Sequence, residues 1–237
     1  MSTGQGFLGI FNDVPAAAET DYLHWLTREH TQERLSVPGF LRVRVFRTEK
    51  KEKSGYFILY RLRHSDVIAS EAYLARLNAP TEWSRRIMPA LKDFRRAGGR
   101  VVHEAGSGEG STVLPLVCAR PDTEAVMTAM DKIVTMDAIV SARFFESDKA
   151  GTAIPTTERA TRSGDGTFDA LLVVEALTDA ALGGVSDALR PIVNLGHSLH
   201  YYQIFDLHES DLRPEDLSAQ AGGRVRFGSD LASESRR

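Results

Sequence analysis

A histidine with charged neighbours lies in the stretch YLHWLTREHTQERLSVPGF, residues 22–40, where it could carry out acid–base chemistry. On a helix with about 100° per residue, His30 falls on the apolar stripe, where the pattern alone favours leucine. A histidine titrates at about pH 6.5 and can take or give a proton at neutral pH. Arg34, one turn further on, could stabilise an enolate or a phenolate. We therefore predict that His30 faces a gap between its helix and a sheet and acts as an acid or base, helped by Arg34.

Apolar and aromatic side chains would form the walls of such a site. They suit a small, partly aromatic ligand, and they would lower the pKa of His30 because burial disfavours the charged imidazolium. A neighbouring Glu33 would raise that pKa again, and the helical wheel turns Thr31 toward solvent. The candidate substrate-binding residues are Tyr22, Trp25, Leu26, Tyr56, Tyr60 and Trp83.

Each of these residues also has a purely structural interpretation. His30 could be a buried histidine bonded to a backbone carbonyl or to Glu33, and Arg34 could form a salt bridge on the helix surface. The tryptophans could simply pack in the core. In the second half of the chain, however, the corresponding helix has methionine and isoleucine where the first half has tryptophan and histidine. That asymmetry favours a functional His30, since folding alone gives no reason for the halves to differ.

The sequence predicts no metal site. His24 and His30 are six residues apart and lie on different faces of a helix, whereas a helical pair of ligands needs a spacing of four. His197 and His200 would point to opposite faces of a strand. Cys118 lies in an apolar run and is expected to pack as a small hydrophobe.

The elements that position His30 follow a simple order. Its helix is expected to stop before Pro38, because helical geometry is disfavoured at the preceding residue, and Gly39 supplies the turn. Alternating apolar residues predict strands on either side. The first half has the predicted order β-α-β-β-α-β, with strands at 7–14, 40–48, 55–63 and 98–106 and helices at 16–35, 65–78 and 81–94.

The same order recurs after a Gly/Ser-rich linker at residues 105–111. This linker is not a dinucleotide-binding loop, because it leads into a strand and not into a helix N-terminus. A long loop at 147–167 is expected to cover the mouth of the cleft, to reach a second subunit, or to be a solvated insertion. The predicted strands are 111–120, 138–147, 167–177 and 198–209, and the predicted helices are 121–136 and 178–194.

Each half therefore has the pattern of a ferredoxin-like βαββαβ unit, whose sheet has one bare face. Two such units in tandem can bury their bare faces against each other. We predict an α+β fold in which a first unit at 1–106 and a second unit at 111–209 form an internal pseudo-dimer. A polar tail follows at 210–237 and is expected to be loosely attached or disordered.

A motif on the first helix resembles a known family. The pattern Tyr-x2-Trp-x4-His-x7-Pro-Gly-Phe, here Tyr22, Trp25, His30 and residues 38–40, resembles the EthD-like branch of the dimeric α+β barrel superfamily. The resemblance implies that the two units form a barrel of the dimeric α+β type, with a ligand in the gap between helix and sheet. Members of the superfamily include cofactor-independent monooxygenases, muconolactone isomerases, polyketide cyclases and haem proteins, so the fold does not fix the function.

We expect a cofactor-independent enzyme of the proton-transfer type, an isomerase, cyclase, lyase or decarboxylase, that acts on a small aromatic or lactone-like carbonyl compound. The alternative is a non-catalytic small-ligand-binding or accessory protein that uses the same cleft. The resemblance also leaves open a haem protein, in which His30, His197 or His200 would be the single axial ligand.

Composition limits the partners. The chain has 237 residues and a net charge of −3, which argues against binding to nucleic acid. No apolar run is long enough to cross a membrane as a helix. A single cysteine excludes an internal disulfide and favours a reducing, cytoplasmic compartment. The expected partner is a small molecule, and the expected assembly is a monomer with an internal pseudo-dimer or a homodimer.

Overall fold

The computed structural model describes residues 4–119, 121–162, 164–192 and 199–213. Most of the predicted polar tail, from residue 214 onward, and His197 lie outside these ranges. Among the described residues, no helix is long and apolar enough to cross a membrane.

The first half of the chain contains four strands, with helices between them. The first helical stretch has four consecutive parts, and the second also has four, the last of which is a short 3₁₀ turn that contains Pro89. We predicted helix as far as residue 94, which is wrong, because the last strand already begins at Lys92. The elements are β1 (Gly6–Pro15), η1 (Ala16–Ala18), α1 (Glu19–Trp25), η2 (Leu26–His30), α2 (Thr31–Leu35), β2 (Phe40–Lys50), β3 (Lys53–Leu62), η3 (Ser65–Ala69), α3 (Glu71–Asn78), α4 (Glu82–Ile87), η4 (Met88–Ala90) and β4 (Lys92–Gly106).

The second half has the same strand and helix order, with two short helices added in its long loop. Its first helix is capped by Asp122, whose side chain accepts a hydrogen bond from the backbone N–H of Ala125. The elements are β5 (Thr112–Cys118), α5 (Thr123–Ile133), β6 (Ile139–Ser147), α6 (Lys149–Thr152), α7 (Thr157–Ala160), β7 (Ala170–Ala176), α8 (Asp179–Leu189), β8 (Tyr201–His208) and η5 (Glu209–Asp211).

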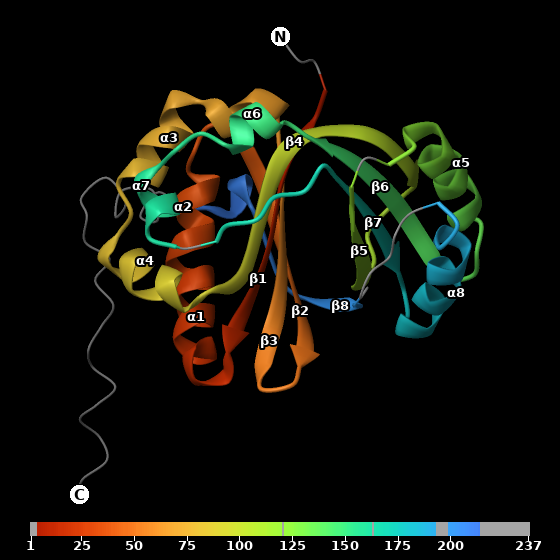
Figure 1. Cartoon of the computed structure of the whole chain (residues 1–237), viewed down its shortest axis with the longest axis horizontal. Helices are drawn as coiled ribbons and strands as arrows, with labels where there is room; N and C mark the ends of the chain where they lie inside the picture. Colours follow the sequence, from red (N-terminus) through yellow and green to blue (C-terminus); the bar gives the residue numbers. More distant parts are fainter. Residues whose placement is uncertain (1–3, 120, 163, 193–198, 214–237) are drawn as a thin grey trace, which may run out of the picture.

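The eight strands form one closed antiparallel barrel in the order β1-β3-β2-β8-β5-β7-β6-β4 (Figure 1). The first half supplies the consecutive strands β4-β1-β3-β2, and the second half supplies β8-β5-β7-β6. The two sheets meet at the pairs β2–β8 and β4–β6. Closure therefore leaves neither sheet with an unpaired edge. The predicted α+β class is confirmed.

The period-two alternation of the strands produces distinct cores. On β1, Phe7 and Phe11 point into the barrel and pack in one cluster with Phe57 of β3 and Phe145 of β6. Leu8 and Ile10, which alternate with them, face outward and pack in the core under the helices of the first half. A separate outer core lies under α5 and α8 and contains Cys118, which is buried as predicted.

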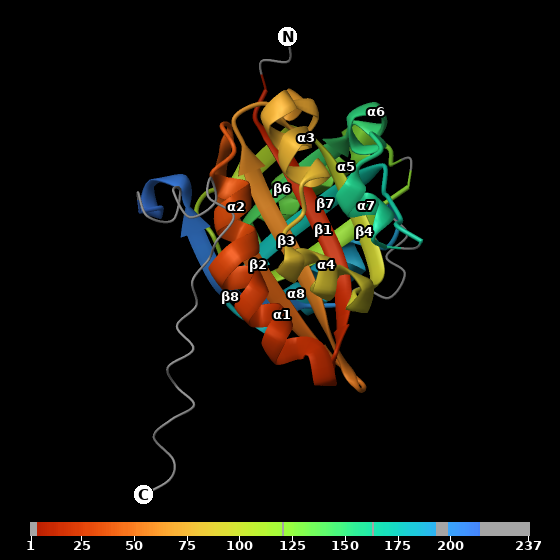
Figure 2. The same ribbon diagram turned by 90° about the vertical axis from the view of Figure 1, so that its left-hand side faces the viewer.

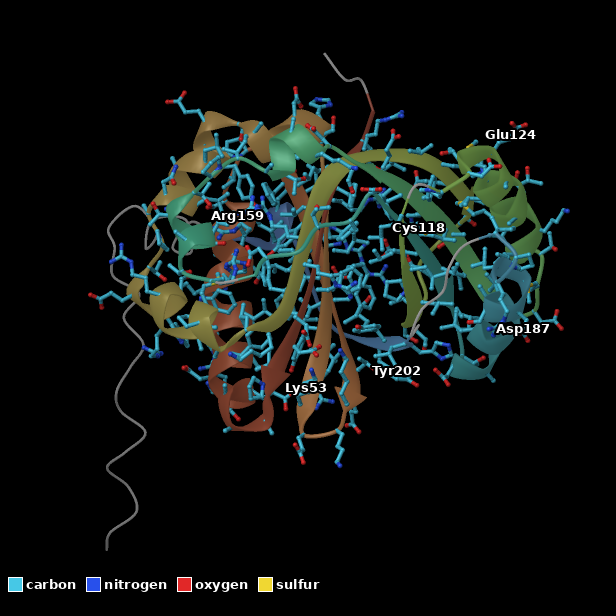
Figure 3. The ribbon with its side chains drawn as sticks, in the orientation of Figure 1. Lys53, Cys118, Glu124, Arg159, Asp187 and Tyr202 are labelled. Carbon is cyan, nitrogen blue, oxygen red and sulfur yellow. The ribbon has the colours of Figure 1, made fainter. Side chains whose placement is uncertain are left out.

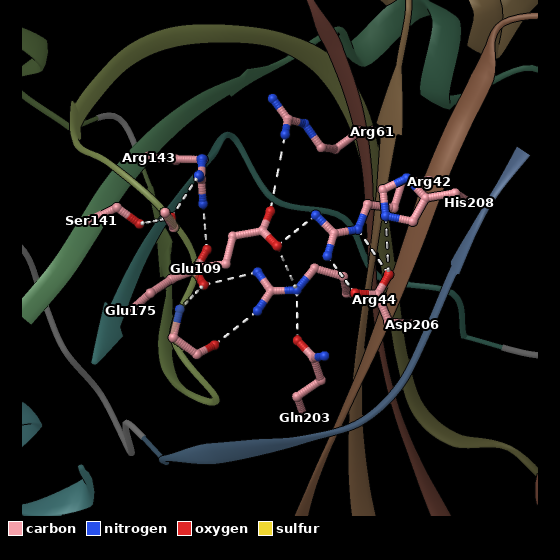
Figure 4. A network of polar contacts seen from close by, with 12 residues as sticks. Arg42, Arg44, Arg61, Glu109, Ser141, Arg143, Glu175, Gln203, Asp206 and His208 are labelled. Atoms are coloured by element: carbon pink, nitrogen blue, oxygen red, sulfur yellow. Dashed lines mark hydrogen bonds and ion pairs between the residues drawn. The ribbon is translucent and has the colours of Figure 1, made fainter. Parts of the chain in front are cut away.

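A network of arginines and carboxylates fills one end of the barrel (Figure 4). Glu175 on β7 is completely buried and accepts hydrogen bonds from Arg44 Nη1 at 2.8 Å and from Arg143 Nη1. The linker between the halves contributes to this network, because the Gly110 N–H donates to Glu175 Oε2 at 3.0 Å and Glu109 pairs with Arg42. Arg44 and Glu175 come from different halves, so their ion pair ties the two sheets together.

The long loop between β6 and β7 packs on the first half of the molecule, although it belongs to the second. The α7 helix lies against α3 on the side of the barrel that also carries α1 and α4 (Figures 1 and 2). Figure 3 shows Arg159 of α7 on that side, opposite Glu124 of α5 and Asp187 of α8. The loop is therefore not a solvated insertion, because its α7 helix packs on the helices of the first half.

Candidate functional site

The helical stretch that carries His30 contains a π-helical segment, Leu26–His30, between α1 and α2. A π-turn inserts one extra residue, and such insertions occur often at functional sites. The insertion rotates the following residues around the helix axis. Our prediction that Thr31 faces solvent is therefore wrong: its side chain is completely buried, and its hydroxyl has no hydrogen-bond partner.

His30 is buried between this helix and the sheet, with 4% of its surface exposed. Its ring lies 4.3 Å from the Trp25 ring, centroid to centroid, and Nδ1 is buried without a hydrogen-bond partner. Burial, together with the positive charges of Arg34 and Arg162, holds the pKa of His30 well below its ordinary value. The imidazole is therefore neutral at pH 7. Glu33 does not offset this, because it is engaged by Arg34.

Arg34 is also buried, and it is held by two carboxylates. Nη1 donates to Glu33 Oε2 at 3.2 Å, and Nη2 donates to Glu158 of α7. Its guanidinium carbon lies 5.8 Å from the centre of the Tyr73 ring. Since Arg34 remains charged, it supplies a fixed positive charge beside His30.

A small cavity lies between the helix and the sheet, as the sequence predicts, and both His30 and Arg34 line it. Its volume is about 20 Å³, which is room for about one water molecule. Asn12 and Glu158 add polar groups to the wall, and Asn12 Nδ2 is buried without a partner. Two side chains of this cavity, Asn12 and His30, thus each carry one buried polar atom without a partner.

Of the predicted substrate-binding residues, Tyr22 and Trp25 line the cavity. Their polar atoms are already used: Tyr22 Oη donates to Asn12 Oδ1 at 3.2 Å, and Trp25 Nε1 donates to Ser84 Oγ at 3.1 Å. These bonds fix both rings and hold the Asn12 amide with its oxygen toward Tyr22. The two aromatic side chains are therefore rigid parts of the wall.

Four of the predicted substrate-binding residues do not line the cavity: Leu26, Tyr56, Tyr60 and Trp83. Tyr56 Oη is turned to Glu19 Oε1, at 2.6 Å, and Trp83 Nε1 donates to Asp21 Oδ1 on the outer side of α1. Tyr60 packs edge-on against Phe40, and its buried hydroxyl has no partner. The structure therefore brings together His30, Arg34, Tyr22 and Trp25 but not these four residues.

Sequence reasoning missed several lining residues. Asn12 carried a weak signal, as a polar side chain inside an apolar strand. Glu158 carried none, because it is 124 residues away from the arginine that it contacts. The missed residues with polar, sulfur or aromatic side chains are Asn12, Tyr73, Met88, Phe94, Arg96 and Glu158.

A larger hollow, about 660 Å³, lies open to solvent between α5 and α8. It lies on the outer face of the second half and is lined largely by alanine and aliphatic side chains. Of its two acidic residues, Asp122 is occupied as the cap of α5 and Glu124 is exposed in the first turn of the same helix. The hollow has volume without an evident reactive group, so we place the candidate site at His30.

No group of three metal-ligating side chains occurs among the residues that the structure describes. His200 Nδ1 lies 2.6 Å from Asp179 Oδ1 near the surface. The cavity beside His30 has room for about one water molecule, which is far less than a porphyrin occupies.

No protein-family model matches the chain, and no curated protein matches its sequence. Solved structures do match. An anthrone oxidase-like protein is 11% identical, with a TM-score of 0.58 over 89% of this chain and 95% of that one. A protein provisionally described as a chlorite dismutase is 13% identical, with a TM-score of 0.51 over 86% and 96%. A protein from Fusobacterium nucleatum, provisionally described as a monooxygenase, is 9% identical, with a TM-score of 0.48 over 86% and 93%.

At such low identity, this likeness concerns the fold alone. The chain is an α+β protein with a closed eight-stranded antiparallel barrel, and it shares this overall fold with the anthrone oxidase-like protein and the protein described as a chlorite dismutase. The matches do not single out the EthD-like branch.

Proposed function

We propose that the chain is a cofactor-independent proton-transfer enzyme that acts on a small aromatic or lactone-like carbonyl compound. The observation that carries this proposal is Nδ1 of His30, a buried atom without a partner on a side chain that lines a cavity. Buried polar atoms are almost always hydrogen-bonded. A lone imidazole nitrogen at a cavity wall is therefore well suited to accept a proton from a bound compound.

The proposed step begins with the tautomer of His30 that carries its proton on Nε2. Nδ1 takes a proton from the carbon next to the substrate carbonyl. The electrons of the broken C–H bond form a C=C bond, and the carbonyl π electrons move onto oxygen. Arg34 stabilises the resulting enolate through its positive charge. In an isomerisation, the imidazolium then returns the proton to a different carbon.

The environment of His30 supports this role in two ways. Its depressed pKa keeps the imidazole neutral, so that Nδ1 has a free lone pair at neutral pH. Arg34 and Arg162, whose positive charges lower the pKa of His30, also disfavour its imidazolium form. The negative charge that develops on the enolate offsets this repulsion as the proton moves to His30. The base therefore becomes stronger at the moment when charge develops on the substrate.

Hydrogen–deuterium exchange of substrate protons tests the proposal. A panel of aromatic ketones and lactones in D2O is followed by proton NMR for loss of the signal next to the carbonyl. We expect exchange with the wild type, and His30→Gln should slow it by about 10²- to 10⁴-fold. His24→Gln is the matched control, because His24 is exposed on the same helix.

A protein that exchanges no compound on the panel, or a His30→Gln variant as fast as the wild type, would contradict the proposal. Binding without exchange would support the alternative, a ligand-binding protein. If His30→Leu raises the melting temperature and leaves exchange intact, the histidine is structural. Visible absorption after addition of haemin tests the haem alternative, since a haem ligated by histidine gives a sharp Soret band.

The architecture that we propose around this site is an internal pseudo-dimer. The orders β4-β1-β3-β2 and β8-β5-β7-β6 match two ferredoxin-like units, at residues 1–106 and 111–209. One unit carries His30. In the other, α5 buries Met130 and Ile133, so we expect one site per chain. The EthD-like assignment and the monomer or homodimer assembly belong to the same proposal.

A further inference from the structure

The segment 153–162, here called the cover segment, reaches the His30 site from the other half of the chain. It contains α7 and is attached to the first half at a few points. The backbone N–H of Thr157 donates to Asn78 Oδ1 at 2.9 Å. The Arg162 guanidinium carbon lies 3.9 Å from the centre of the Phe94 ring. The cover segment therefore closes the site without belonging to its helix–sheet core.

Glu158 is the residue that the cover segment places in the cavity wall. Of the described lining residues, it alone comes from the second half of the chain. Its side chain is 9% exposed, its Oε2 accepts a hydrogen bond from Arg34, and its Oε1 lies 3.7 Å from Arg162 Nη1. The loop between β6 and β7 thus supplies the Glu158 carboxylate to Arg34, a buried arginine of α2.

If Glu158 moved out of the cavity, two arginines would lose a negatively charged partner. Arg34 would keep only Glu33, and burial raises the pKa of Glu33, which weakens it as a negative partner. Arg162 would keep Asp165, at 3.0 Å. An uncompensated buried charge is strongly unfavourable. Glu158 can therefore leave the cavity at low cost only if another anion takes its place on Arg34.

The small size of the cavity also requires Glu158 to move when a substrate binds. The cavity holds about one water molecule, so a carbonyl compound with an aromatic ring needs a wall residue to move. Most other lining residues belong to strands and helices that form the core of the first half. Movement of the cover segment opens the cavity and, in the same step, withdraws a carboxylate from Arg34.

We propose that Glu158 holds the place of an acidic group of the substrate, so that the His30 site takes anionic aromatic compounds, carboxylates or phenolates, which displace the cover segment. This inference rests on the proposed function for the location of the site. Asn12 and His30 line the same cavity, and their unpartnered atoms Nδ2 and Nδ1 would serve the substrate carbonyl and its neighbouring carbon.

Binding of benzoate and of its neutral analogue benzamide tests the proposal. Titration calorimetry with Glu158→Gln should show benzoate bound at least roughly tenfold more tightly than by the wild type, because the internal competitor has lost its charge. Benzamide affinity should change less than about threefold, since it has no charge to gain from Arg34. Glu158→Asp, which keeps the charge, should bind benzoate as the wild type does. Glu146→Gln is the control, at an exposed glutamate paired with Arg100.

A measurement on the wild type covers the case in which Glu158→Gln does not fold. Benzoate should accelerate amide hydrogen exchange in the cover segment, followed by mass spectrometry, while benzamide should not. Three results would overturn the proposal. Glu158→Gln could gain affinity equally for benzoate and benzamide, or for neither. Amide exchange in the cover segment of the wild type could remain unchanged when benzoate is added.

The two proposals fail separately. If benzoate behaves as expected but no carbonyl compound exchanges its protons, the anion site stands and the reaction is wrong. If neutral ketones exchange in a His30-dependent manner while benzoate has no preference for Glu158→Gln, the reaction stands and the substrate class is wrong.

Discussion

Glu175 allows a direct test of how the barrel is held closed. Its side chain is completely buried and accepts hydrogen bonds from Arg44, Arg143 and the Gly110 N–H. The partner Arg44 is on β2 in the first half and has 4% of its side chain exposed. Glu175→Gln keeps the shape of the side chain but removes the nearer of the two carboxylates that balance Arg44; the other, Glu109 Oε2, lies 3.7 Å from Arg44 Nε.

The expected loss follows from the burial of the pair. Removing one partner of a buried ion pair costs about 3–5 kcal/mol, because the other charge is left uncompensated. The amide oxygen of glutamine can still accept one hydrogen bond, so we expect a loss near the lower end, about 3 kcal/mol. For a chain of this length, that lowers Tm by roughly 6–12 °C.

Urea unfolding followed by circular dichroism measures the loss. Glu146→Gln is the control. It breaks an ion pair in which the side chain of Arg100 is 54% exposed and that of Glu146 is 50% exposed, so it should cost less than about 1 kcal/mol. Glu175→Leu combined with Arg44→Leu should be more stable than Glu175→Leu alone, because the buried cation that has lost its nearest carboxylate is then gone.

Two results would refute this reasoning. One is a Glu175→Gln protein within about 1 kcal/mol of the wild type, the range of exposed ion pairs. The other is a loss that disappears in about 1 M NaCl, where the Debye length is about 3 Å, because a buried pair is only weakly screened.

The two remaining predictions concern a turn and a carboxylate. Gly39 has φ +98°, and a Cβ there would lie 2.6 Å from Val67 Cγ2, whereas Gly164 has φ +77° and open space around it. Gly39→Ala should therefore lower the free energy of unfolding by about 1–3 kcal/mol, and by more than Gly164→Ala does. Equal urea midpoints for the two variants would contradict this. The hydrogen bond from Arg47 lowers the pKa of Glu19 from 4.5 to about 2, so its stabilising effect is complete above pH 4.5 and is lost as pH falls toward 2. The difference in unfolding free energy between the wild type and Glu19→Gln should narrow over that range, and a constant difference would show that Glu19 is not the titrating group.

Prediction from the sequence succeeded where local rules are sufficient. Alternation with period two located the strands, and Pro38 with Gly39 located the end of the first helix. It failed where one residue changes the phase of a pattern: the π-helical insertion at Leu26–His30 buried Thr31, which a regular wheel turns to solvent. It also failed after Pro89, where pairing of β4 with β1, beginning with Lys92 opposite Asp13, outweighs helix propensity.

The sequence by itself determined the order of the elements, the α+β class and the position of an unusual histidine on an apolar helix face. Only the tertiary structure decided that Glu158 reaches Arg34, that Asn12 shares the cavity with His30, and that Trp83 lies outside it. The physical reason is distance along the chain. Periodicity and turn chemistry act over a few residues, whereas closure of the barrel brings β6 beside β4 and thereby lays the loop of one half over the helix of the other.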